Sequence, residues 1–93
     1  IIAVTGLAGH ALGSWRSSDR HTVWLRDFLP RDIPTCRILT FGYESTVQHS
    51  VSVNRFQHYG KQLLERLREV RDHDDVRDRP IIFVGHSLGG ILI

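Results

Sequence analysis

Apolar residues gather in three short runs that are separated by longer, mixed segments. The runs lie at 1–4, 36–43 and 80–84, and each closes on glycine or leads into a turn that contains glycine. Short runs of this kind are typical of strands in a parallel sheet that is covered on both faces. We therefore expect three strands, and we expect the last of them, Ile81 to Val84, to be buried on both faces.

The segments between these runs show a helical rhythm. From Val53 to Arg71 apolar residues recur every three or four positions, with charged residues on the other side. A shorter helix is expected from His21 to Leu29, capped by Ser18 or Asp19 and ended near Pro30. Alternation of strands and helices predicts an α/β fold, in which three parallel strands are joined by right-handed crossovers and carry helices on both faces.

The last strand-like run leads directly into Gly85-His86-Ser87-Leu88-Gly89, which fits the G-x-S-x-G pattern of a nucleophile elbow. A strand-to-helix turn this sharp forces the serine into a strained backbone conformation, and side chains at the two glycine positions would collide with the turn. The helix that follows aims free N–H groups at the serine, where a negative charge could be held. An ordinary glycine-rich turn is the alternative, but the strand before it and the helix-compatible residues after it favour the elbow.

The first strand opens into a second glycine-bearing loop, Thr5-Gly6-Leu7-Ala8-Gly9-His10. Gly6 and Gly9 allow the backbone to approach another group closely, and the amide of Leu7 is the natural donor to point at that group. A plain turn at the end of a strand is the alternative. The presence of the elbow favours a loop that forms the second half of one site.

Composition narrows the function classes. An apolar content of 41% and a charged content of 24% are ordinary for a globular domain. The net charge is only +2, and the arginines are spread along the chain rather than gathered on one stripe, which argues against a nucleic-acid partner. Cys36 is the only cysteine, so an internal disulfide is excluded and a reducing compartment is weakly favoured.

His73 lies among acids in the charged loop 71–79, but its spacing suits no common metal site, and we expect neither metal nor cofactor. No apolar run is long enough to span a membrane.

The chain begins without Met and stops where a helix should be in its first turn. We therefore expect it to be a piece of a longer polypeptide.

Several segments together resemble a known family. They are Val4 to His10 with Trp15, then residues 24–30, 37–43 and 81–90. These segments resemble the front half of α/β-hydrolase domains. Among these domains they are most similar to the lipase-like serine esterases, which include the serine active site-containing proteins and domains at the front of large fungal NACHT and repeat proteins. The resemblance covers essentially all of the chain, and it implies that residues 1–93 form a partial α/β-hydrolase domain.

The resemblance also implies a site. The first strand of this chain would lie between the other two, so that the loop after Val4 lies beside the elbow. Ser87 would then attack the acyl carbon of an ester, and the backbone amides of Leu7 and Leu88 would hold the oxyanion. Gly6, Gly85, His86 and Gly89 would support this arrangement.

In the family the catalytic acid and histidine follow the serine, beyond the last residue of this chain. The local histidines are poor substitutes, since His86 should point away from Ser87 and His10 suits a structural or substrate-side role. The others (His21, His49, His58 and His73) are expected in exposed positions. We therefore expect this piece alone to be inert, because a serine without a base is a weak nucleophile.

The implied partners are an acyl ester or lipid substrate, the remainder of the same polypeptide and C-terminal NACHT or repeat domains. The implied location is intracellular, in the cytoplasm or on mitochondrial or endoplasmic reticulum membranes, and the implied process is lipid metabolism.

The chain departs from the family in its opening loop. Thr5 stands where relatives have histidine, and Ala8 stands where they often have glycine. We expect the loop to form but to be held less firmly, with Thr5 still able to make a hydrogen bond, and we expect Thr5→His to raise ester turnover about ten-fold. The alternative function is a catalytically inactive module for binding or signalling. Nucleotide binding is disfavoured, since the chain contains neither G-x-x-x-x-G-K-S/T nor G-x-G-x-x-G.

Overall fold

The computed structural model describes residues 1–43, 52–72 and 77–93. Expectations for residues 44–51 and 73–76, including those for His49 and His73, lie outside this description. Along the chain the elements are β1 (Ile2–Val4), η1 (Gly13–Trp15), α1 (Trp24–Asp27), α2 (Leu29–Asp32), β2 (Leu39–Phe41), α3 (Val53–Asp72), β3 (Phe83–Gly85) and α4 (Gly89–Leu92). All three strands are shorter than the apolar runs that predicted them, whereas α3 has the expected extent.

The strands form one parallel sheet in the order β2-β1-β3, so the expected α/β fold with the first strand in the centre is confirmed. Val4 lies level with Phe41 on one side and with Gly85 on the other. Because parallel strands end at the same edge of a sheet, the loop that follows Val4 and the turn that follows Gly85 emerge next to each other.

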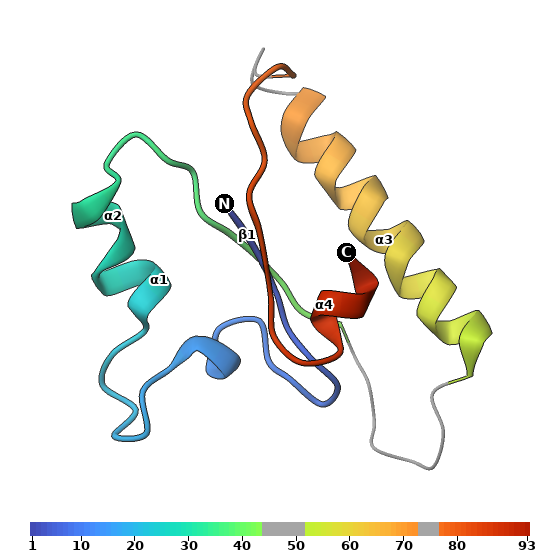
Figure 1. Cartoon of the computed structure of the whole chain (residues 1–93), viewed down its shortest axis with the longest axis horizontal. Helices are drawn as coiled ribbons and strands as arrows, with labels where there is room; N and C mark the ends of the chain where they lie inside the picture. Colours follow the sequence, from blue (N-terminus) through green and yellow to red (C-terminus); the bar gives the residue numbers. More distant parts are fainter. Residues whose placement is uncertain (44–51, 73–76) are drawn as a thin grey trace.

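Helices cover both faces of the sheet, with α1 and α2 on one side and α3 and α4 on the other (Figure 1). Side chains alternate along β1, so Ala3 faces one layer while Ile2 and Val4 face the other. The first buried cluster comprises Ala3, Trp15, Val23 and Leu25, and the second comprises Ile2, Val4 and Leu63. The core therefore lies on the two faces of the central strand.

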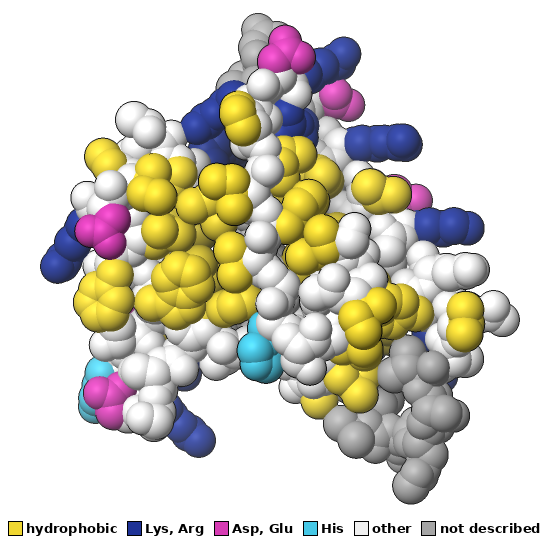
Figure 2. All heavy atoms as spheres, in the orientation of Figure 1, with side chains coloured by type: hydrophobic (Ala, Val, Ile, Leu, Met, Phe, Trp, Pro, Cys, Tyr) yellow, Lys and Arg dark blue, Asp and Glu magenta, His cyan; other side chains and the backbone are white. Residues whose placement is uncertain are grey.

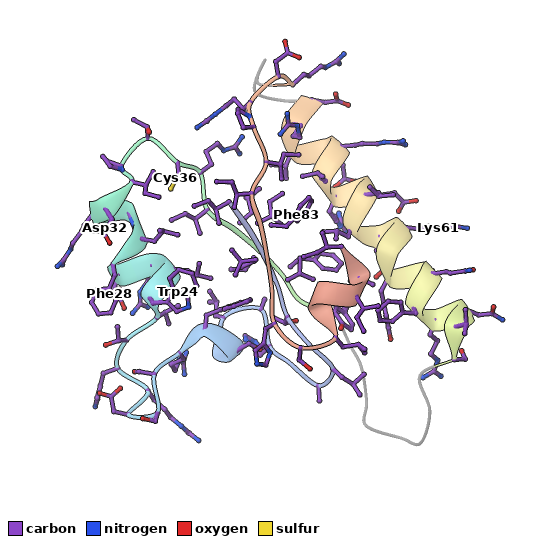
Figure 3. The ribbon with its side chains drawn as sticks, in the orientation of Figure 1. Trp24, Phe28, Asp32, Cys36, Lys61 and Phe83 are labelled. Carbon is purple, nitrogen blue, oxygen red and sulfur yellow. The ribbon has the colours of Figure 1, made fainter. Side chains whose placement is uncertain are left out.

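The expectation that the last strand is buried on both faces is wrong for this chain. Ile82 is 58% exposed and Phe83 is 36% exposed, because β3 is an edge strand with β1 on one side only. Phe83 projects to the side of α3 and α4 (Figure 3). Figure 2 shows hydrophobic side chains gathered on both sides of this edge. Apolar composition predicted a strand here, but its place in the sheet decides its exposure.

The helix expected from His21 to Leu29 is replaced by two short ones. Trp24 begins α1, and Phe28 both ends α1 and precedes α2. Pro30 lies within α2 rather than beyond its end, because a proline in the first helical turn gives up an N–H that has no partner there. Phe28 is apolar but 53% exposed, and it lies near Trp24 on this layer (Figure 3).

The expected cap on this helix is also wrong. Asp19 accepts a hydrogen bond from the His21 amide, 3.0 Å away, and so closes a turn before the helix. Neither Ser18 nor Asp19 caps α1, whose N-cap residue is Val23. The Val23 amide donates instead to the carboxylate of Asp27, one turn ahead, at 2.8 Å.

Candidate active site

The elbow occupies the turn between β3 and α4. Ser87 is exposed and has a φ of 53°, in the left-handed region that side-chain-bearing residues rarely adopt. A side chain at Gly85 would place its Cβ 2.5 Å from the Cα of Gly90, and one at Gly89 would place its Cβ 2.4 Å from the carbonyl oxygen of Val4. The strained serine and the steric need for both glycines agree with the geometry expected from the sequence.

The opening loop lies directly against this elbow. A Cβ added at Gly6 would lie 2.9 Å from the carbonyl oxygen of His86 and 3.0 Å from the Cβ of Ser87. The β1–β3 ladder continues past the strand end, since the His86 amide donates to the Val4 carbonyl at 3.0 Å. The structure therefore brings together the two segments that the sequence proposed as halves of one site.

Two backbone amides at this junction have no hydrogen-bond partner among the described residues. Among the described residues, no acceptor receives a hydrogen bond from the amide of Leu7 or from that of Leu88. The loop around Leu7 is a tight turn in which the Gly9 amide donates to the Gly6 carbonyl at 3.1 Å, and Ala8 has a φ of 54°. A left-handed alanine is disfavoured where glycine would not be, which gives the Ala8 departure a physical consequence.

Thr5 is fully buried at the start of the opening loop. Its amide donates to the Phe41 carbonyl at 3.1 Å, which ties the loop to β2. Its hydroxyl oxygen, however, has no hydrogen-bond partner among the described residues, so the expected side-chain hydrogen bond is not formed there. The effect of Thr5→His stays a prediction, and the imidazole would have to fit a position with no exposed surface.

The described histidines do not provide a base for Ser87. The Nδ1 atom of His10 accepts hydrogen bonds from the amides of Leu12 and Gly13, both at 3.2 Å, which is a structural role. The ring of His86 packs edge-on against Trp15, with centroids 6.1 Å apart and planes at 74°. His21 and His58 are exposed, as expected. Within the described part of the chain, the Ser87 hydroxyl has no hydrogen-bond partner.

The contact between Trp15 and His86 was not found by sequence reasoning. Trp15 was noted as part of the family resemblance, but no role followed from it. An aromatic residue soon after the opening loop was the available signal. The fold, not the spacing, brings this residue against the elbow.

No metal site or membrane span is found in the described ranges 1–43, 52–72 and 77–93. No group of three His, Cys, Asp or Glu side chains gathers there in a way that could hold a metal ion. None of the helices in these ranges has the length and apolar content needed to cross a bilayer. Cys36 is a free thiol in a half-buried position on the segment before β2 (Figure 3).

Comparison with known proteins gives one set of matches. Protein SERAC1 from Danio rerio is 30% identical to this chain over 112 residues, and Protein SERAC1 from Bos taurus and from Homo sapiens are 26% and 25% identical over 113 residues. The chain is a distant homologue of Protein SERAC1. Each match covers the whole chain but only 17% of the length of the relative.

Comparison with protein-family models and with solved structures gives no match. Homology to SERAC1 is consistent with the resemblance to serine active site-containing proteins. The roles of Ser87, Leu88 and Leu7 stay predictions.

Proposed function

We propose that residues 1–93 are the front part of an α/β-hydrolase domain in a serine hydrolase that cleaves an acyl ester. In this proposal Ser87 attacks the acyl carbon, and the amides of Leu7 and Leu88 bind the oxyanion that forms. The ester is that of a lipid or a similar acyl compound. The acid and the histidine that complete the mechanism come from residues beyond this chain.

One observation carries the proposal above the others. Ser87 is held at a φ of 53° in an exposed turn, directly against the opening loop at Gly6. Strained residues persist only where surrounding structure enforces them, and they are concentrated at functional sites. The amides of Leu7 and Leu88, which have no partner among the described residues, support the proposal because an oxyanion needs free donors of this kind.

The chemistry expected at this site is an acyl transfer in two steps. A histidine outside this chain would take the proton of the Ser87 hydroxyl as its oxygen bonds to the acyl carbon, and would return the proton to the leaving alcohol. Water would then release the acid from the acyl-enzyme. Loss of one oxyanion donor in such a site costs about 100- to 1,000-fold in turnover.

The test uses the full-length protein that carries this chain. A fluorophosphonate probe should label it, and Ser87→Ala should abolish both labelling and turnover of a short-chain ester. Ser18→Ala is the matched control, because Ser18 is exposed in the segment before α1, outside the elbow and the opening loop. Equal labelling of the wild type and of Ser87→Ala would overturn the proposal.

A second candidate function is favoured by the buried hydroxyl of Thr5. Its lack of a partner among the described residues fits a loop that is not maintained for catalysis. In that case the domain is an inactive module for binding or signalling at the front of a larger protein, with NACHT or repeat domains behind it. A full-length protein that is folded but not labelled at Ser87 would support this candidate.

A further inference from the structure

The two proposed oxyanion donors lie on separate segments, so something must fix their spacing. Leu7 belongs to the opening loop and Leu88 to the elbow, and no hydrogen bond between described residues joins these two segments directly beyond the His86–Val4 ladder bond. The close approach at Gly6 is a contact and not a bond. Because a single van der Waals contact is weak, the two segments stay close only if neighbouring side chains also pack against them.

The side chain of His86 is one such neighbour. Its Nδ1 atom is 3.4 Å from the position of a Cβ on Gly6, so the imidazole borders the opening loop. The same ring meets Trp15 edge-on at a centroid distance of 6.1 Å. His86 is thus placed between the loop that carries Leu7 and a large aromatic ring.

Trp15, the other partner in that contact, is held in the core. It is 7% exposed and belongs to the buried cluster on the α1 face of the sheet. The turn η1 that carries it begins at Gly13, and the Nδ1 atom of His10 accepts hydrogen bonds from the amides of Leu12 and Gly13. A Cβ at Gly9 would lie 2.7 Å from the Ser14 hydroxyl oxygen, so η1 also packs back on the opening loop.

We propose that Trp15 is a positioning residue which, through the His86 ring, holds the opening loop against the elbow and so sets the spacing of the Leu7 and Leu88 amides. The catalytic part of this inference rests on the proposed function. Its structural part, a loop held by an aromatic contact, does not. The two parts are therefore measured separately.

His86 is the residue to change, because it is exposed and its truncation leaves no buried cavity. His86→Ala removes the ring, whereas His86→Phe keeps an aromatic ring without imidazole nitrogens. Trp24→Phe is the matched control, since Trp24 also meets Trp15 edge-on, at 6.2 Å and 74°, but from α1. If the contact with Trp15 carries the effect, His86→Ala should matter and Trp24→Phe should not.

The structural readout is hydrogen–deuterium exchange of the peptide covering residues 5–10 in the full-length protein. Its Thr5 and Gly9 amides donate to Phe41 and Gly6, so their exchange reports how firmly the loop is held. His86→Ala should speed this exchange about ten-fold. His86→Phe should restore most of the protection, and Trp24→Phe should leave it unchanged.

The catalytic readout is turnover of a short-chain ester. With the loop loosened, kcat should fall about ten-fold in His86→Ala with KM within about two-fold, because the donors act on the transition state. His86→Phe should recover most of kcat. In a Trp15→Leu background, His86→Ala should cause no further loss, because the partner of the ring is already gone.

The outcomes separate the two claims. Unchanged exchange in His86→Ala, or equal damage from His86→Phe, overturns the positioning role of Trp15 whatever the activity. Faster exchange in His86→Ala that His86→Phe reverses, in a protein without Ser87-dependent turnover, supports the loop contact and removes the proposed hydrolase function. Faster exchange with unchanged kcat overturns the link between loop position and catalysis.

Discussion

The segments that form β1 and β3 are both apolar and have different surroundings. A pair of isoleucines lies at the start of each segment, Ile1-Ile2 at β1 and Ile81-Ile82 just before β3, and both strands run into a glycine-bearing turn at the same edge of the sheet. Yet Ile2 is 5% exposed in β1, whereas Ile82, just before β3, is 58% exposed. The central strand has a neighbour on each side and a layer on each face, and the edge strand does not. Hydrophobicity thus selects a strand, and position in the sheet decides its share of the core.

The largest effect should come from changing the same residue type in the two places. Ile2→Ala should lower the free energy of unfolding by about 3 kcal/mol, because it removes buried methyl groups and leaves a cavity. Ile82→Ala should cost less than about 1 kcal/mol, since most of that side chain already meets solvent. Pulse proteolysis of the full-length protein in urea would measure both. Equal losses would mean that the edge of β3 is covered in the full-length protein.

A second pair of substitutions compares two adjacent glycines at the start of α4, Gly89 in the elbow and Gly90 just after it. Gly89→Ala should destabilise the protein by about 2 kcal/mol, since its Cβ would lie 2.4 Å from the Val4 carbonyl oxygen and 2.5 Å from that of Thr5. Gly90→Ala meets nothing within 4 Å and should stabilise the helix by up to about 1 kcal/mol. Thermal unfolding would show the opposite signs. A tolerated Gly89→Ala would contradict the close packing of α4 on β1.

The buried hydroxyl beyond β1 should give a smaller effect of opposite direction. Thr5→Val keeps the shape of the side chain but removes an oxygen that has no partner among the described residues, so stability should rise by about 1 kcal/mol. Urea unfolding with Thr5→Ser as the control measures this. Loss of stability in Thr5→Val would show that the hydroxyl is hydrogen-bonded, for example to a buried water.

The smallest effect concerns the layer over β1 and appears only in acid. The Arg26 guanidinium, followed by the Val23 amide, lowers the pKa of Asp27 to about 2. A carboxyl whose pKa is lower in the folded state stabilises that state above its unfolded pKa of about 3.8, and this contribution is lost as the pH falls toward 2.

The matching measurement is the pH dependence of unfolding for Asp27→Asn. The wild type should lose its advantage over this variant between about pH 4 and pH 2, with little difference in the slope at higher pH. Asp19, whose pKa is lowered by the Ser17 hydroxyl and then by the His21 amide, titrates in the same direction and is unchanged in both proteins. A constant difference between wild type and variant across this range would exclude a role for the Asp27 charge.

Local sequence features predicted most of the elements and both halves of the candidate site. The period of apolar residues marked α3 almost to its ends. The G-x-S-x-G pattern around Ser87 implied a strained turn, because a sharp change from strand to helix leaves no room for side chains at Gly85 and Gly89. The single helix expected over residues 21–29 is divided into α1 and α2 at Phe28, and the Asp27 carboxylate receives the Val23 amide in place of the expected cap, neither of which the apolar pattern indicated.

The sequence by itself determined where strands and the long helix form, and which residues a nucleophile elbow requires, because those features follow from local periodicity and backbone sterics. Tertiary structure alone decided three other things. It left apolar side chains at β3 exposed, it buried the Thr5 hydroxyl without a described partner, and it placed the Trp15 ring against His86. Each depends on residues far apart in the chain meeting across the sheet, and no local pattern encodes such a meeting.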